Sequence, residues 1–118
     1  MGTTLKVIPP LVLVFLLTFG LVSAPVVEVK TDLLYFGATW CPPCKEMKRL
    51  FKDADVKSEL DKYDFKMYDY DEDTELAEYY GVEYLPTMVF ERDEEEIDRQ
   101  VGGREKYDLL KILRKNLN

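Results

Sequence analysis

The two cysteines of this chain, Cys41 and Cys44, flank two prolines in a Cys-Pro-Pro-Cys motif. An apolar stretch, 33–38, precedes the motif, and a helical pattern follows it. A strand that leads into a helix would place both thiols in the first helical turn, where the helix dipole favours a thiolate. Thiolates attack disulfides and bind soft metal ions. The pair is therefore a reactive dithiol, a local structural disulfide or a metal site with two thiolate ligands.

Composition excludes several other kinds of chemistry. The chain has 118 residues and no histidine. It therefore has room for one small domain, and it lacks Ser-His catalysis, Cys-His catalysis and every histidine-containing metal site. Two cysteines cannot build a closed four-thiolate zinc site. The net charge of −7 disfavours nucleic acid as a partner. We expect no bound metal and no cofactor.

The first part of the chain reads as a targeting segment. Residues 7–27 carry no charge, and Lys6 precedes them. We expect residues 1–24 to be a signal peptide or an N-terminal membrane anchor, 25–30 a short linker, and 31–118 the folded domain. Both alternatives place the domain outside the cytoplasm, as a periplasmic, secreted or membrane-anchored protein.

The apolar pattern after residue 30 predicts an α/β domain. The apolar run at 31–38 is typical of a central strand covered on both faces. The last helix should show an apolar stripe of Tyr107, Leu110, Leu113 and Leu117. The expected strands are 31–38, 65–70, 87–91 and 97–101, and the expected helices are 42–63 with a kink near 53–55, 74–80 and 107–117.

Three segments resemble the thioredoxin-fold family: 40–45 with the dithiol motif, 80–87 with a Leu-Pro-Thr sequence, and 101–103 with a Val-Gly-Gly sequence. They cover nearly all of residues 29–118 in the order of that family. The resemblance implies a thioredoxin-like α/β fold with a minimal β-α-β-α-β-β-α core. A mixed central sheet would be flanked by helices, and the extra first strand and helix of the family would be missing.

The resemblance also implies roles for residues near the motif. Cys41 would be the exposed attacking thiol, and the more buried Cys44 would resolve the mixed disulfide. Pro86 would follow a cis peptide bond and face the dithiol. Leu85 would offer backbone groups to a bound peptide, and Trp40 would shield the site. The expected substrate-binding residues are Trp40, Pro42, Pro43, Leu85 and Pro86.

Two positions depart from the family pattern. Tyr35 stands where the family usually has a buried acid, and Met67 stands where it often has a lysine on the next strand. We expect these two side chains to surround the place of the missing acid. A tyrosine is a poor base at neutral pH, so the usual proton relay to Cys44 is absent or rebuilt.

The leading functional hypothesis is thiol–disulfide exchange on protein substrates outside the cytoplasm. Reduction is favoured over oxidation for two reasons. The thioredoxin-like Trp-Cys-x-Pro-Cys-Lys frame is retained. The resemblance also implies that an oxidising enzyme of this fold would carry a large helical insertion, for which the chain has no room. The enzyme would need an electron donor or acceptor that the sequence does not identify. If the N-terminal segment is uncleaved, it would hold the protein at the membrane. We expect the protein to be a monomer. The alternatives are a copper chaperone or metal-transfer protein, and a non-catalytic thioredoxin-fold binding module.

Three tyrosines near the third expected strand, Tyr79, Tyr80 and Tyr84, form a candidate partner surface.

Overall fold

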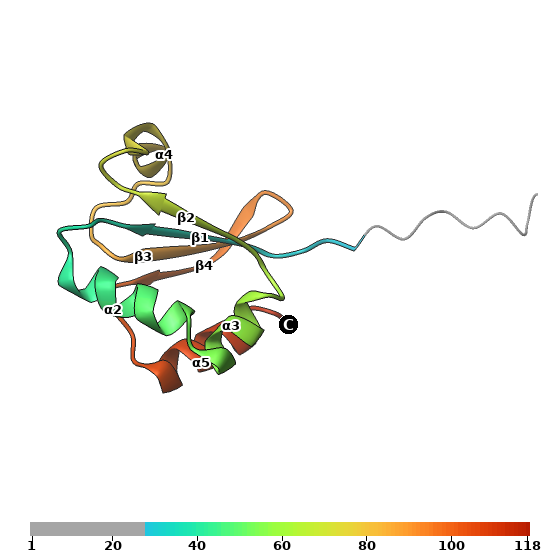
Figure 1. Cartoon of the computed structure of the whole chain (residues 1–118). Coiled ribbons are helices and arrows are strands. Elements are labelled where there is room, and N and C mark those ends of the chain that lie inside the picture. Colours follow the sequence, from blue (N-terminus) through green and yellow to red (C-terminus); the bar gives the residue numbers. More distant parts are fainter. Residues whose placement is uncertain (1–27) are drawn as a thin grey trace, which may run out of the picture.

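The computed structural model describes residues 28–118, so the expected signal or anchor segment, 1–24, lies outside the described residues. The described chain forms a four-stranded sheet with helices on both faces (Figure 1). In the part of the chain from residue 28 onward, no helix has the length and apolar character needed to span a membrane. The elements in chain order are β1 (Asp32–Gly37), α2 (Pro42–Phe51), α3 (Ala54–Leu60), β2 (Asp64–Asp69), α4 (Thr74–Tyr79), β3 (Thr87–Arg92), β4 (Glu95–Val101) and α5 (Lys106–Lys115).

The sheet is mixed, as the family resemblance implies, with strand order β2-β1-β3-β4. Strand β1 pairs with β2 in parallel and with β3 antiparallel, and β3 pairs antiparallel with β4. Because β1 and β2 are parallel, their carboxyl ends lie side by side, with Gly37 in register with Asp69. The dithiol motif follows β1 directly, so it lies at this end of the sheet.

Both faces of the central strand β1 are covered. The side chains of Leu33 and Tyr35 belong to the core under α2, α3 and α5. Those of Leu34 and Phe36 belong to a smaller core on the opposite face, where α4 packs. This alternation is what a strand covered on both faces produces, and it confirms the interpretation of its continuous apolar run.

The helix expected over 42–63 is two helices, and the predicted kink near 53–55 is a complete break. The side chain of Asp53 accepts hydrogen bonds from the backbone N–H groups of Asp55 at 3.0 Å and Val56 at 3.3 Å. A carboxylate that caps two N–H groups in this way starts a new helix. Helix α3 therefore begins at Ala54 with its own direction, and it ends at Leu60.

The predicted stripe of the last helix is wrong at its first residue. Tyr107 is 76% exposed, whereas Leu109 and Leu113 are fully buried. Leu109 and Leu113 are four residues apart and share the helix face that packs on the sheet. Tyr107 lies two residues before Leu109, which places it on the opposite side of the helix.

Candidate active site

The dithiol lies at the start of α2. Cys41 is the N-cap residue of this helix, and Pro42 and Pro43 occupy its first two positions. The prolines have no N–H groups, so the first N–H group of the helix belongs to Cys44. It donates to the sulfur atom of Cys41 at 3.3 Å. No acidic residue stands in the first turn, so this helix end stabilises negative charge on the Cys41 sulfur atom.

Cys41 and Cys44 are joined in a disulfide, with their Cα atoms 5.2 Å apart. Cys44 is fully buried, as the resemblance implies, but Cys41 is only 4% exposed. The expectation of an exposed Cys41 is therefore wrong for this oxidised state. The reason is local packing, because Ala38, Tyr70 and Leu85 gather around the two sulfur atoms. Cys41 is still the more accessible cysteine of the pair.

The three segments that carry the resemblance meet at this site. The Leu85–Pro86 peptide bond is cis, as the resemblance implies. The N–H group of Gly102 donates to the Pro86 carbonyl oxygen at 2.7 Å. A Cβ atom added to Gly103 would lie 3.3 Å from the Cβ atom of Pro43. The 101–103 loop therefore packs between the cis-proline and the prolines of the dithiol motif.

A groove of about 470 Å³ borders the disulfide. Four of the five expected substrate-binding residues line it, but Pro86 does not, because Pro86 is fully buried. Trp40 is 62% exposed and donates its indole N–H to Asp71 at 2.8 Å, so it forms a fixed rim. The lining residues are Trp40, Cys41, Pro42, Pro43, Tyr70, Glu83, Tyr84 and Leu85.

The sequence missed two residues of the groove, Tyr70 and Glu83. Tyr70 could have been found, because it directly follows β2 and the carboxyl ends of β1 and β2 lie together. The three tyrosines proposed as one partner surface are divided. Tyr84 lines the groove, whereas the ring of Tyr80 packs against that of Phe36 on the α4 side of the sheet.

Tyr35 occupies the buried place next to the resolving cysteine. Its side chain is fully buried, and its hydroxyl group donates to the carbonyl oxygen of Cys44 at 3.3 Å. Burial raises the pKa of Tyr35 to about 12. A Cβ atom on Gly37 would lie 2.8 Å from the Tyr35 ring, so the missing side chain makes room for the phenol.

Met67 does not surround this place as expected. It stands opposite Tyr35 in the β1–β2 register, but its side chain is 45% exposed at the edge of the sheet. The side chain of an edge residue has solvent on one side, so pairing with a buried neighbour does not bury it.

The comparison with known proteins identifies the family. The thioredoxin family model matches residues 23–115, which is most of the chain. The chain belongs to the thioredoxin family. A thioredoxin of Staphylococcus epidermidis is 35% identical over 95 residues, which cover 77% of this chain and 86% of that protein. Thioredoxin H5 of rice is 38% identical over 86 residues; this match covers 69% of this chain and 62% of the rice protein, which is less than two thirds of its length.

Solved thioredoxin structures share the fold. The thioredoxin of Malassezia sympodialis superposes with a TM-score of 0.66 at 30% identity, over 75% of this chain and 76% of that chain. The thioredoxin of Nicotiana alata gives a TM-score of 0.65 at 32% identity, over 74% of this chain and 73% of that chain. Members of the thioredoxin family are thiol–disulfide oxidoreductases, and Cys41 and Cys44 are the only thiols of this chain that can carry that chemistry.

Proposed function

We propose that this protein reduces disulfides in protein substrates outside the cytoplasm, with Cys41 as the attacking thiol and Cys44 as the resolving thiol. The observation that carries the proposal is the contact between the Cys44 N–H group and the Cys41 sulfur atom at the start of α2. Because the two prolines before Cys44 have no N–H groups, this is the first N–H group of the helix, and it donates to the sulfur atom of Cys41. That arrangement supports a thiolate on Cys41 and distinguishes the roles of the two cysteines.

The reaction transfers two electrons in two exchange steps. The Cys41 thiolate attacks one sulfur atom of the substrate disulfide, which releases the other substrate sulfur as a thiolate. Cys44 then loses its proton and attacks Cys41 in the mixed disulfide. This step releases the second substrate thiol and forms the Cys41–Cys44 disulfide that the structure contains. A dithiol donor must reduce that disulfide before the next cycle.

The groove beside the disulfide suits an extended peptide. Trp40 and Tyr84 are both largely exposed and line it, and aromatic side chains of this kind bind a peptide through broad apolar contact. Leu85 lies against the disulfide and would align the peptide backbone with the sulfur atom of Cys41. Glu83 adds one carboxylate to the rim.

Two parts of the proposal rest on the sequence. The retained Trp-Cys-x-Pro-Cys-Lys frame supports reduction rather than oxidation. The uncharged N-terminal stretch over 7–27 supports export, through a signal peptide or an anchor. The absence of histidine and of a methionine-rich tract near the dithiol weakens the copper alternative.

An insulin-reduction assay run beside a copper titration tests the proposed activity. With dithiothreitol as donor, the wild-type protein should accelerate insulin precipitation, and the Cys41→Ser variant should not. Tight stoichiometric binding of Cu(I) without insulin reduction would overturn the proposal in favour of metal transfer. A reporter that is active only outside the cytoplasm, fused after Asn118, tests the location. Recovery of an inactive fusion in the soluble cytoplasmic fraction would refute export.

A further inference from the structure

The outer edge of β2 has unpaired backbone groups. Among residues 28–118, strand β2 pairs only with β1 and so forms one edge of the sheet. The N–H groups of Asp64 and Tyr70 donate to carbonyl groups on the β1 side at 3.0 Å and 2.8 Å. Backbone groups of successive residues in a strand point to alternate sides. Phe65 and Met67 therefore direct their N–H and C=O groups away from β1, to the open edge.

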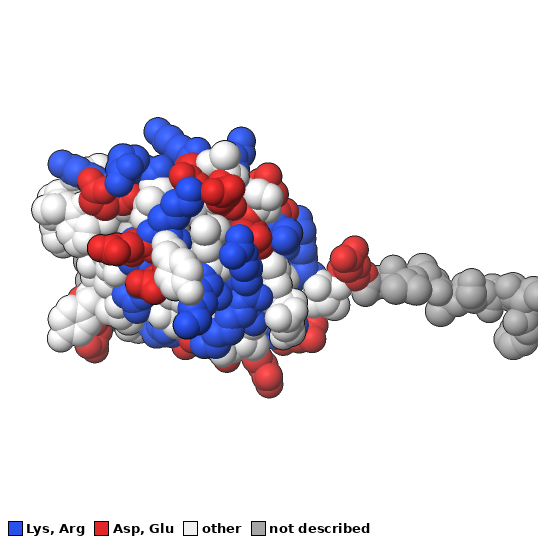
Figure 2. All heavy atoms as spheres, turned by 90° about the horizontal axis from the view of Figure 1, so that it is seen from below, with Lys and Arg blue, Asp and Glu red and all other residues white. Residues whose placement is uncertain are grey.

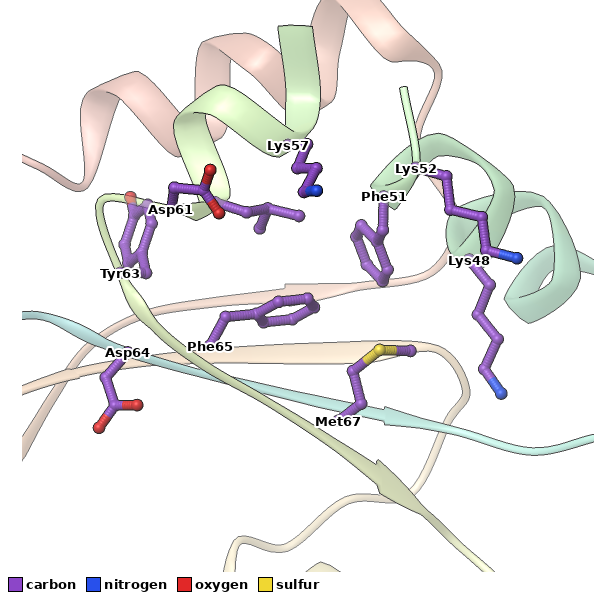
Figure 3. Close-up of a pocket in the computed structure, with 10 residues that line it drawn as sticks. Lys48, Phe51, Lys52, Lys57, Asp61, Tyr63, Asp64, Phe65 and Met67 are labelled. Atoms are coloured by element: carbon purple, nitrogen blue, oxygen red, sulfur yellow. The ribbon is translucent and has the colours of Figure 1, made fainter. Parts of the chain in front are cut away.

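An apolar groove of about 640 Å³ runs beside this edge, between β2 and the helices α2 and α3. Its floor consists of Phe51, Phe65 and Met67, and Figure 3 shows the rings of Phe51 and Phe65 facing each other, with the side chain of Met67 beside them. The rings of Phe51 and Phe65 are in edge contact, with centroids 5.1 Å apart. The same two residues that expose backbone groups at the edge, Phe65 and Met67, thus also place their side chains in the groove.

Three lysines surround the groove: Lys48 from α2, Lys52 directly after α2, and Lys57 from α3. Figure 3 shows Lys48 at the Met67 end and Lys57 on the other side of Phe51. Among residues 28–118, no carboxylate forms a salt bridge with any of the three, although the whole chain carries a net charge of −7.

The distribution of charge is uneven in the same region. Figure 2 shows many basic side chains over the face that α2, α3 and α5 cover, with acidic side chains among them. Asp61 and Asp64 line the groove at the start of β2, beyond Lys57. At the far end, Lys48 and Met67 also line a smaller hollow together with Asp69, Glu72 and Asp73. The groove itself combines an apolar floor with lysines at its rim, which is complementary to a ligand that is both apolar and acidic.

We propose that this groove binds an extended segment of a protein partner, which adds to the free edge of β2 as a further strand. The free N–H and C=O groups of Phe65 and Met67 would pair with the segment. On the groove side, an apolar side chain would lie against Phe65 and Met67 between two carboxylates that reach Lys57 and Lys48. Since every second residue of a strand faces the same side, the segment has the pattern acidic-x-apolar-x-acidic.

A peptide explains all three features of the site together. A nucleic acid would use the lysines but not the apolar floor, and the acidic chain would repel it. A lipid would use the lysines and the floor but not the unpaired backbone at the edge. The groove is formed by the outer edge of the sheet and shares no lining residue with the groove beside the disulfide. A partner held at this edge therefore leaves the dithiol free to react.

Fluorescence anisotropy with a labelled peptide, Ser-Glu-Thr-Leu-Thr-Glu-Ser, tests the proposal on the full 118-residue chain in a non-ionic detergent. The peptide should bind saturably, and a version with lysine in place of glutamate should not bind. The double variant Lys48→Glu/Lys57→Glu should weaken binding about tenfold, because two favourable charge pairs become repulsive. The matched control Lys30→Glu/Lys111→Glu makes the same charge change at exposed positions outside the groove and should bind as the wild type does.

Two N-methylated peptides test backbone pairing. One is methylated at the odd amides and the other at the even amides. Only alternate N–H groups of an added strand face β2, so one peptide should lose binding and the other should keep it. Equal binding by both peptides, or equal weakening in both double variants, would overturn the proposal, as would binding to phosphatidylglycerol vesicles but not to the peptide. Insulin reduction in the same variants reports on the dithiol separately, so failure of one proposal leaves the other standing.

Discussion

The replacement Tyr35→Phe tests how the resolving cysteine loses its proton. The phenol is buried against Cys44, and its pKa is about 12. At pH 7 about one phenol in 10⁵ is ionised, so Tyr35 cannot serve as the base for Cys44. The phenylalanine variant should therefore resolve a mixed disulfide within about threefold of the wild-type rate. In both proteins the rate should rise with pH, because Cys44 must lose its proton before it can attack the mixed disulfide.

The same replacement has a pH-dependent effect on stability, and its sign can be worked out. Near pH 7 the variant loses the hydrogen bond to the Cys44 carbonyl oxygen, which costs about 1 kcal/mol of unfolding free energy. The folded-state pKa of Tyr35 is raised from 10.0 to about 12, so the stability linked to the phenol is complete below pH 10. It is lost as the pH rises toward 12, and two pKa units correspond to about 3 kcal/mol.

Wild-type protein should therefore be the more stable of the two at pH 7 and the less stable above about pH 11. Urea unfolding followed by the fluorescence of the single tryptophan, Trp40, measures the difference at each pH. The remaining tyrosines titrate in both proteins, so their effects cancel. Stopped-flow fluorescence measures the resolution step. A tenfold slower resolution in Tyr35→Phe at pH 7, or a stability difference of constant sign up to pH 12, would refute the reasoning.

Three further predictions concern the dithiol and the loops that support it. The Cys44→Ser variant should accumulate substrates as mixed disulfides on Cys41, visible on non-reducing gels, and comparable turnover in Cys44→Ser and Cys41→Ser would contradict the assigned roles. The guanidinium group of Arg104 donates to all three carbonyl groups of the 101–103 loop, which packs against the prolines of the site. Arg104→Ala should therefore raise the KM for insulin about threefold with little change in kcat. An unchanged KM would argue against a positioning role for Arg104. In Gly37→Ala, the new Cβ atom would clash with the Tyr35 ring. This variant should lose about 1–3 kcal/mol of stability in urea unfolding, and wild-type stability would show that the ring can move at no cost.

The sequence predicted the parts of the site that depend on local order along the chain. A strand followed at once by Cys-Pro-Pro-Cys fixes the place of Cys41 at a helix start, and the prolines leave the Cys44 N–H group as the first helical donor. The cis bond at Pro86 and the approach of the 101–103 loop could be expected only from the family resemblance. Neither has a local signature in the residues themselves.

The parts that the sequence missed depend on contacts between distant segments. Cys41 is buried because Tyr70 and Leu85, far along the chain, pack against the disulfide. Met67 is exposed because β2 is an edge strand, which the alternation of its side chains cannot reveal. The helix break at Asp53 was predictable as a kink but not as a break, because an aspartate caps a helix only when the backbone before it leaves the helical path.

The claim that Cys41 is the activated thiol is tested most directly by alkylating the reduced protein with iodoacetamide at pH 6 and identifying the labelled cysteine by peptide mass. Cys41 should be labelled first and faster than a model thiol, because the Cys44 N–H group and the helix start stabilise its thiolate. Preferential labelling of Cys44, or labelling of neither cysteine above the model-thiol rate, would contradict the account.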